Sequence, residues 1–506
     1  MVEVRSTESA GSGVFATREY EIGSTVLEEN EPMVVLAPTS KQQEDALHAV
    51  IPATASKNKK KNGKAKDDDG DVSFLSSIKV PSKIDERYHG KFRGMVQAVA
   101  CFAEFCKVED SLPSLLELYH PSLTEPNENE ASIVGCAKEA LKFLQNHAKG
   151  GSKVQKFVTD RPEEATKSML VWSCNAFQGG RIYAKESRVN HSCNPNAIIK
   201  ADGDKQSIVA AVAIQPGDEV TISYLGVLLY AEQRVRQEEL LQMKHFRCEC
   251  TRCQDGFDPA GAIPCPSCHP RQGRYLEEDV QFDDEQDVHY AIQRSSSAKA
   301  FECHVCSNKV PTVSEDPNHV TNLTQSVDRR VVSYLHDQEL RNDRKDQDEA
   351  LVEEEWADQL LQLAMSVAGA KHWTTNLLLL ENLNRGLRGQ HERMIETSEP
   401  PSMEDLAQCI DSLERICRFV QGIKLKMHMG HLLANVIIGV GRSLVSLGDT
   451  KSKKYAAEWV SKVQEFGEKF ESPGIQKVIE ALMVAWKQKG SNGNAEKRVS
   501  KKQRLS

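Results

Sequence analysis

The sequence lacks a long apolar run. No window approaches about 18 consecutive apolar residues, the length that a membrane-spanning helix needs, so we expect no transmembrane segment. The first residues, Met-Val-Glu-Val-Arg-Ser-Thr-Glu, also lack the apolar stretch of a secretory signal. We therefore expect a protein of the cytoplasm, the nucleus or both, whose fourteen cysteines are thiols and metal ligands rather than disulfides.

An excess of positive charge is also missing. The chain has 64 Lys and Arg against 73 Asp and Glu, a formal net charge of −9. This balance argues against general affinity for DNA or RNA. Basic runs at 57–66 and 497–504 could serve as nuclear import signals, although solvated charge is the commoner explanation.

At 506 residues the chain is too long for one hydrophobic core, so several domains are expected. Glycine-flanked β-branched runs predict short strands in residues 1–36, and the charged run at 37–92 predicts a partly disordered insertion. Helical periodicity in 93–170 places Met95, Val99, Phe102 and Phe105 on one stripe, and strands and turns return in 171–247. The remaining segments are a cysteine-rich region, a helical region and a basic, disordered tail, at 248–310, 325–488 and 489–506.

The helical region predicts a domain of repeated helical hairpins. Expected helices include those around 360–365, 377–380 and 409–420, and further ones cover 427–447 and 455–466. A break at Leu447-Gly-Asp449 suggests a hairpin, and stacked hairpins suggest a tetratricopeptide-like solenoid.

Two groups of cysteines have metal-ligand spacing. Cys248, Cys250 and Cys253 supply three thiolates, and tetrahedral zinc requires a fourth ligand from elsewhere. Cys265, Cys268, Cys303 and Cys306 form two C-x2-C knuckles, typical of a zinc ribbon, although their separation is longer than usual and His269 or His304 could substitute. The alternative is unligated thiols, and for the other helical or strand cysteines burial as small apolar side chains is the better explanation.

Five motifs follow one another in a fixed order: Gly11-x-Gly-Val-Phe-Ala16, Cys174-Asn-Ala-Phe177, Asn190-His-Ser-Cys-x-Pro-Asn196, Pro216-Gly-Asp-Glu-Val-Thr-Ile-Ser-Tyr224 and the C-x-C-x2-C cluster. In this order they resemble the two split halves of a SET domain of the SET-and-MYND (SMYD-type) branch. The resemblance implies an α+β fold: small β-sheets of the pseudoknotted β-clip type, a zinc-bound post-SET region and an all-α C-terminal domain. It also implies protein-lysine methyl transfer from S-adenosylmethionine.

The resemblance assigns roles to individual residues. Gly11, Gly13 and Val14 would form the turn on the cofactor side. The cofactor would further be held by Asn175, Asn190 and His191. Tyr224 would be catalytic, Phe246 would pack on the adenine or line the lysine channel, and Cys193 would complete the first zinc site.

The residue types suit this chemistry. A lysine must lose its proton before it can attack a methyl group, so its site must favour the neutral amine. Rate then comes from alignment and from oxygen dipoles around the methyl group. Glycines permit close backbone approach and Asn and His offer donors and acceptors, but each of these residues alone would more often be structural.

The sequence departs from the family pattern in two places. Residues 37–92 contain no cysteine, so the MYND finger is absent. Lys244 stands where relatives often have an aromatic residue, which leaves open the shape of the lysine channel and the number of methyl groups transferred.

Three other functions would each fit part of the sequence. The SET fold could be an inactive scaffold whose helical domain recruits partners. A zinc-dependent nucleic-acid binder would fit the knuckles and the basic tail, but not the acidity. The third alternative is a plant-type SET enzyme; these enzymes generally lack the C-x-C-x2-C cluster, so Cys248, Cys250 and Cys253 argue against that branch. We expect a monomer that acts on a lysine-containing protein segment and binds neither membrane nor, directly, nucleic acid.

Overall fold

A computed structural model of the protein describes residues 2–7, 11–51, 74–254, 258–268, 290–293, 299–341 and 350–397, with scattered residues at 411–425 and at 484. The chain divides into two compact units: residues 1–224 with 238–248, and residues 225–237 with 249–506. Each unit is described by itself.

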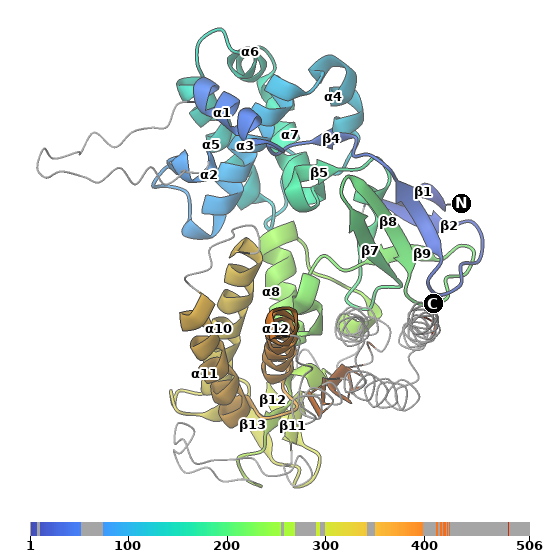
Figure 1. The fold of residues 1–506 in the computed structure, drawn as a ribbon, viewed down its shortest axis with the longest axis vertical. Coiled ribbons are helices and arrows are strands. Elements are labelled where there is room, and N and C mark those ends of the chain that lie inside the picture. The colour runs from blue at the N-terminus through green and yellow to red at the C-terminus, as the bar shows by residue number, and fades with distance from the viewer. Residues whose placement is uncertain are drawn as a thin grey trace, which may run out of the picture. The chain divides into compact units, whose positions relative to one another are not determined.

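The first unit contains a layer of helices around its largest apolar core (Figure 1). The helices are α1 (Lys41–Val50), α2 (Phe74–Ser77), α3 (His89–Phe105), α4 (Val108–Leu116), α5 (Ala131–His147), α6 (Lys153–Asp160) and α7 (Pro162–Asn175). Side chains of Ser40 and Ser152 cap α1 and α6 by accepting backbone N–H groups, and Pro162 begins α7.

The helical stripe predicted in α3 is correct at three of its four positions. Met95, Val99 and Phe102 are fully buried, whereas Phe105 is 38% exposed. Phe105 is the last residue of α3, and the next residue, Cys106, has an extended backbone conformation that ends the helix. Helix α1 also lies inside the segment 37–92, and the charged run of that segment falls on residues outside the described ranges.

Short strands form the rest of the first unit. One sheet has the order β1 (Val2–Thr7), β2 (Gly11–Ala16), β9 (Glu219–Ile222) and β6 (Asn190–His191). A second has the order β3 (Thr25–Glu29), β8 (Lys205–Ala210) and β7 (Ala197–Asp202), and a third pairs β4 (Val34–Val35) with β5 (Arg181–Ile182). All pairs are antiparallel except β6 with β9. Strands from both ends of the unit's sequence thus share sheets, which confirms the α+β class and its small sheets.

Three short helices also belong to this unit: η1 (Glu86–Tyr88), which precedes α3, and η2 (Gln178–Gly180) and η3 (Glu186–Arg188), which lie before and after β5. After β9 come η4 (Gly226–Tyr230), α8 (Gln233–Lys244), α9 (Thr251–Gln254) and η5 (Pro259–Gly261).

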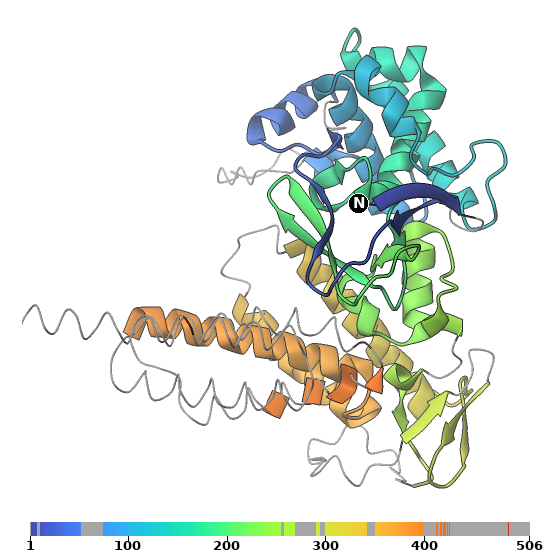
Figure 2. The same cartoon turned by 90° about the vertical axis from the view of Figure 1, so that its right-hand side faces the viewer.

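The second unit combines a small sheet with long helices (Figure 2). The antiparallel sheet has the order β10 (Ile263–Pro264), β11 (Tyr290–Gln293), β12 (Ala300–Cys303) and β13 (Lys309–Pro311). The helices α10 (Val320–Arg341), α11 (Ala350–Ala368) and α12 (Trp373–Thr397) follow, so a helical C-terminal region is confirmed. No helix in the described part of the chain is both long enough and apolar enough to cross a membrane.

Several predictions lie outside the described residues. They are the helices at 427–447 and 455–466, the break at Leu447-Gly-Asp449, the tail at 489–506, and His269, Cys409 and Cys417.

Candidate active site and metal centres

The parallel pairing of β6 with β9 brings the two central motifs together. Asn190 is opposite Thr221 and His191 is opposite Ile222. The backbone N–H of Ser192 donates to the carbonyl of Ile222 at 3.0 Å and extends the pairing. The end of β9 is thereby held beside the Asn-His-Ser-Cys segment, and Tyr224 follows directly.

Tyr224 is fixed at both its backbone and its hydroxyl. Its N–H donates to Nδ1 of His191 at 3.0 Å, and its hydroxyl donates to the carbonyl of Val189 at 2.6 Å. Burial raises the pKa of Tyr224 well above its usual range, with the neighbouring Cys174 as the next cause. The hydroxyl therefore stays protonated at physiological pH.

Three aromatic rings meet at this point. The ring centroids of His191 and Tyr224 are 5.3 Å apart, and Phe246 lies 6.1 Å from His191 and 6.5 Å from Tyr224. Tyr224 and Phe246 are both partly exposed. The structure thus groups the predicted catalytic tyrosine with two of the predicted cofactor residues.

The glycine turn of β2 lies against the same segment. The side-chain amide of Asn190 donates to the carbonyl of Ser12 at 3.1 Å and to Glu219 at 2.7 Å. A Cβ atom on Gly13 would lie 2.5 Å from Oε1 of Glu219 and 3.0 Å from Nδ2 of Asn190, so a larger residue there would have to displace these side chains. Gly11 has φ +74°, a backbone conformation that favours glycine, and Val14 is fully buried.

Asn175 is placed at the C-terminal end of α7. Its side-chain nitrogen donates to the carbonyls of Tyr119 and Val171, both at 2.8 Å. Both amide hydrogens are thereby directed within the protein, which leaves the side-chain oxygen as the group suited to an external donor.

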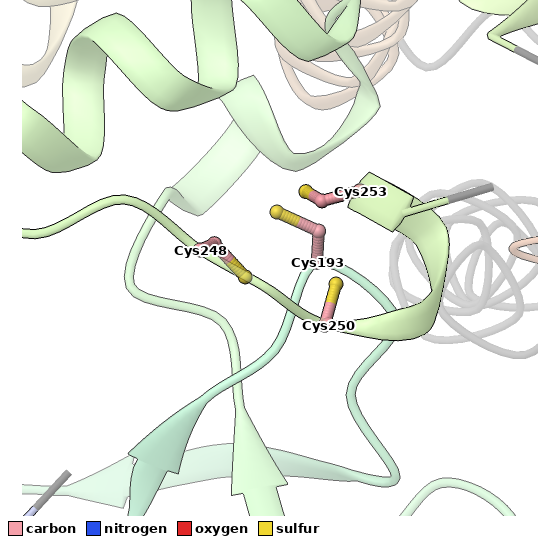
Figure 3. Close-up of side chains that lie close together, drawn as sticks. All are labelled: Cys193, Cys248, Cys250 and Cys253. Atoms are coloured by element: carbon pink, nitrogen blue, oxygen red, sulfur yellow. The ribbon is translucent and has the colours of Figure 1, made fainter. Parts of the chain in front are cut away.

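The first cysteine cluster has four members. The sulfur atoms of Cys193, Cys248, Cys250 and Cys253 lie within 4.8 Å of one another and point toward a common centre (Figure 3). Four thiols at this separation form a donor set that zinc prefers in structural sites. Nε2 of His191 lies 3.3 Å from Sγ of Cys193. Because Nδ1 accepts from Tyr224, Nε2 of the neutral imidazole carries the proton and faces the sulfur.

The second cluster is built on the small sheet of the second unit. The sulfur atoms of Cys265, Cys268, Cys303 and Cys306 also lie within 4.8 Å of one another. Cys265 and Cys303 are fully buried in an apolar cluster around this sheet. Nδ1 of His304 contacts the carbonyl of Tyr290 at 3.2 Å, and no histidine of the described residues is a member of either cluster.

Sequence reasoning missed a group of lysines beside Tyr224. Nζ of Lys244 lies 5.2 Å from the centroid of the Tyr224 ring, and Lys91, from α3, reaches the carbonyl of Met243 at 3.1 Å. The position of Lys244 in a usually aromatic place was visible in the sequence. Lys91, about 150 residues earlier in the chain, carried no signal, because only the packing of α3 places it there.

Comparison with known proteins gives a family match and several relatives for part of the chain. Residues 11–225 match the family model of the SET domain. The histone-lysine N-methyltransferase SMYD3 of Mus musculus is 39% identical over 84 residues, 16% of this chain and 19% of that protein. The N-lysine methyltransferase SMYD2 of Rattus norvegicus is 28% identical over 164 residues, 29% of this chain and 36% of that protein. A putative SET domain-containing protein of Acanthamoeba polyphaga mimivirus is 31% identical over 145 residues, 28% of this chain and 54% of that protein.

The chain therefore contains a SET domain, formed by the strands and helices of its first unit. Parts of this chain are similar to the two SMYD lysine methyltransferases. The aligned segments span only 19% and 36% of the two SMYD proteins, so the likeness concerns the domain and not the whole relatives.

Proposed function

We propose that this protein is an S-adenosylmethionine-dependent protein-lysine N-methyltransferase. The observation that carries the proposal is Tyr224, held between His191 and Val189 inside a matched SET domain. The names of the SMYD relatives, which are lysine methyltransferases, support the same activity. The substrate is a lysine-containing segment of a histone or another protein.

The residues around Tyr224 fit the proposed cofactor. Strand β9, which leads to Tyr224, pairs with β2, the strand of Gly11 and Gly13, and with β6, the strand of Asn190–His191. The ring of Phe246 contacts that of Tyr224. When bound, S-adenosylmethionine supplies an electrophilic methyl group on a positively charged sulfur. Gly11, Gly13, Val14 and the side-chain oxygen of Asn175 would bind it together with Asn190, His191 and Phe246.

Tyr224 would act as an oriented oxygen dipole. Its hydroxyl is protonated and already donates to a carbonyl, so its lone pairs are directed away from Val189. Such an oxygen can accept weak C–H bonds from a polarised methyl group without moving a proton.

The two cysteine clusters would each hold one structural zinc ion. The first would fix the loop that carries Phe246, because Cys248 lies two residues after it and Cys193 lies two residues after His191. The second would stabilise the four-stranded sheet of the second unit.

The activity can be tested with labelled S-adenosylmethionine and a cell lysate as the source of protein substrates. We expect the wild-type chain to label protein lysines, and Tyr224→Phe to lose at least about a hundred-fold in rate, as for other lost catalytic dipoles. Equal labelling by both proteins would contradict the assignment of Tyr224.

Tyr183→Phe is the matched control. Tyr183 is a buried tyrosine of the same unit whose hydroxyl also donates to a carbonyl, that of Asp204 at 2.8 Å. The Tyr183→Phe variant should retain methyltransferase activity. Calorimetric titration with S-adenosylmethionine separates an enzyme from an inactive SET scaffold, because a scaffold has no need of the cofactor.

A further inference from the structure

An ammonium group of α8 lies beside the proposed catalytic tyrosine. Lys244 is the last residue of α8, and its Nζ lies 5.2 Å from the centroid of the Tyr224 ring. The same nitrogen donates to the carbonyl of Cys174, at the end of α7, at 2.8 Å. Lys244 and Tyr224 are both partly exposed, so this charge lies at a point that solvent reaches.

A second ammonium group reaches the same region from α3. Nζ of Lys91, which is also partly exposed, donates to the carbonyl of Met243 at 3.1 Å and to that of Ser173 at 3.4 Å. Neither Lys91 nor Lys244 forms an ion pair with a carboxylate among the residues that the structure describes. Two lysines without a carboxylate partner thus lie near the point where the chemistry is proposed to occur.

The helix ends offset only part of this charge. The C-terminal end of a helix carries about half a negative charge, so the ends of α7 and α8 together leave about one positive charge uncompensated. The charge of Lys244 is the second cause, after burial, that lowers the pKa of Lys91 to about 8. Glu239 acts on Lys91 more weakly than Lys244 does. A further negative charge beside the two lysines would therefore be stabilised.

The other titratable groups that act on these lysines supply no negative charge at neutral pH. Burial raises the pKa of Cys174 to about 11 and that of Cys136 to about 12, and it lowers the pKa of His245 to about 4. Tyr224 stays protonated. Glu219, the carboxylate that acts on Tyr224, already accepts a hydrogen bond from Asn190 at 2.7 Å.

We propose that Lys91 and Lys244 make the enzyme select target lysines that have a glutamate or aspartate one or two positions away in the substrate chain. This inference rests on the proposed function. The target nitrogen has to reach Tyr224, so its nearest neighbours in the substrate pass close to both ammonium groups. Successive Cα atoms are only about 3.8 Å apart, and charges act over about 8 Å in physiological salt. A carboxylate at these positions is attracted by both lysines, whereas an arginine or lysine is repelled.

The test uses the full chain, labelled S-adenosylmethionine and a library of peptides with one central lysine. The peptides come in pairs that differ only by glutamate or glutamine at one neighbouring position, so that shape is kept and charge is changed. For the wild type, kcat/KM should be about three-fold or more higher for the glutamate peptide of a pair. This ratio should fall towards one in about 0.5 M salt, which screens the charges.

Substitutions of the two lysines should reduce the same ratio. Lys244→Met and Lys91→Met each remove one charge and should each lower it, whereas Lys244→Arg keeps the charge and should keep the ratio. Thermal melting shows whether each variant folds. If Lys244→Met does not fold, Lys244→Gln replaces it, because its amide can still donate to a carbonyl.

Lys138→Met is the matched control. Lys138 is a lysine of α5 whose Nζ also donates to a carbonyl, that of Leu123 at 3.1 Å. It is not among the groups that act on Tyr224, Lys91 or Lys244. The Lys138→Met variant should keep the wild-type preference for glutamate.

The outcomes separate this inference from the methyltransferase proposal. A ratio near one for the wild type, or an unchanged ratio in folded and active Lys244 and Lys91 variants, would overturn the selection alone. Labelling of lysate proteins without labelling of any acidic peptide would also overturn the selection alone. If the wild type labels neither lysate proteins nor peptides, the methyltransferase proposal fails and the selection fails with it.

Discussion

His191 connects the proposed cofactor pocket with the first cysteine cluster. One ring nitrogen accepts the N–H of Tyr224 and the other faces the sulfur of Cys193. A change at Cys193 should therefore be transmitted through one imidazole to the backbone of Tyr224, the proposed catalytic residue. A change at the Tyr224 hydroxyl has no such connection to the cluster.

These contacts predict different consequences for two substitutions. Cys193→Ser should lose one bound zinc ion and weaken S-adenosylmethionine binding, because His191 connects Cys193 with the backbone of Tyr224. Tyr224→Phe should keep both metal and cofactor. Elemental analysis and calorimetry measure the two properties. A Cys193→Ser protein with full zinc content would remove Cys193 from the ligand set.

The lowered pKa of Lys91 predicts that the free energy of unfolding depends on pH. Its pKa in the folded protein is about 8, below the ordinary 10.5, so the unfolded chain binds more protons between these values. The stability cost of burying Lys91 is therefore fully present below about pH 8 and is relieved as the pH rises towards about 10.5. At about 1.4 kcal/mol per pKa unit, the cost is at most roughly 3.5 kcal/mol.

Chemical denaturation of the wild type and of Lys91→Met would show this dependence. The free energy of unfolding of the wild type, relative to the variant, should rise between about pH 8 and about pH 10. Loss of the bonds to Ser173 and Met243 shifts the difference at every pH, so the slope is the quantity to compare. A flat difference would mean that the Lys91 ammonium is well solvated.

At the scale of elements, the approach of α3 to α7 depends on one glycine. A Cβ atom on Gly94 would lie 2.0 Å from Cη2 of Trp172, inside the core of the helical layer. Gly94→Ala should therefore destabilise the protein by about 1–3 kcal/mol, because the core has no room for another carbon.

Gly135 provides the matched control. It also lies within a helix, α5, but nothing is within 4 Å of the position of its added Cβ. Gly135→Ala should stabilise the protein by up to about 1 kcal/mol through helix propensity. Thermal melting of both variants measures the contrast. Similar melting temperatures would mean that α3 and α7 can separate at little cost.

Elements also show where sequence patterns stop being informative. Periodicity predicted the buried stripe of Met95, Val99 and Phe102 because burial on one helix face repeats with the helical turn. The same pattern was wrong at Phe105, since a periodicity says nothing of where the neighbouring elements end. The two-residue strand β6 and its parallel pairing with β9 have no periodic signature at all.

At the scale of the whole molecule, each of the two cysteine clusters should be able to lose its zinc ion without loss of the other ion. Each has its own four sulfurs, one beside Tyr224 and one in the small sheet of the second unit. We expect two zinc ions per chain, and Cys306→Ser should lose one of them while S-adenosylmethionine binding is kept. Elemental analysis of both proteins, with calorimetry, tests this. A wild-type zinc content near zero would remove both sites.

The sequence by itself determined the resemblance to a SET domain, which the match of residues 11–225 supports. The five motifs, the cysteine spacings and the missing cysteines of 37–92 also gave the proposed ligands and the departures from the family pattern. These features were readable because a close backbone approach or a metal ligand tolerates few residue types. The order and spacing of the motifs were enough to propose Tyr224 as the catalytic residue, but they did not predict which side chains surround it.

Only the tertiary structure decided which side chains surround Tyr224. Lys91 and Lys244 are far apart in the chain, and the sequence marked only Lys244, as a departure from the family pattern. They meet because α3, α7 and the end of α8 pack around the same point, where helix-terminal carbonyls hold two ammonium groups. Contacts of this kind depend on distance in space, and residue spacing along the chain carries no record of them.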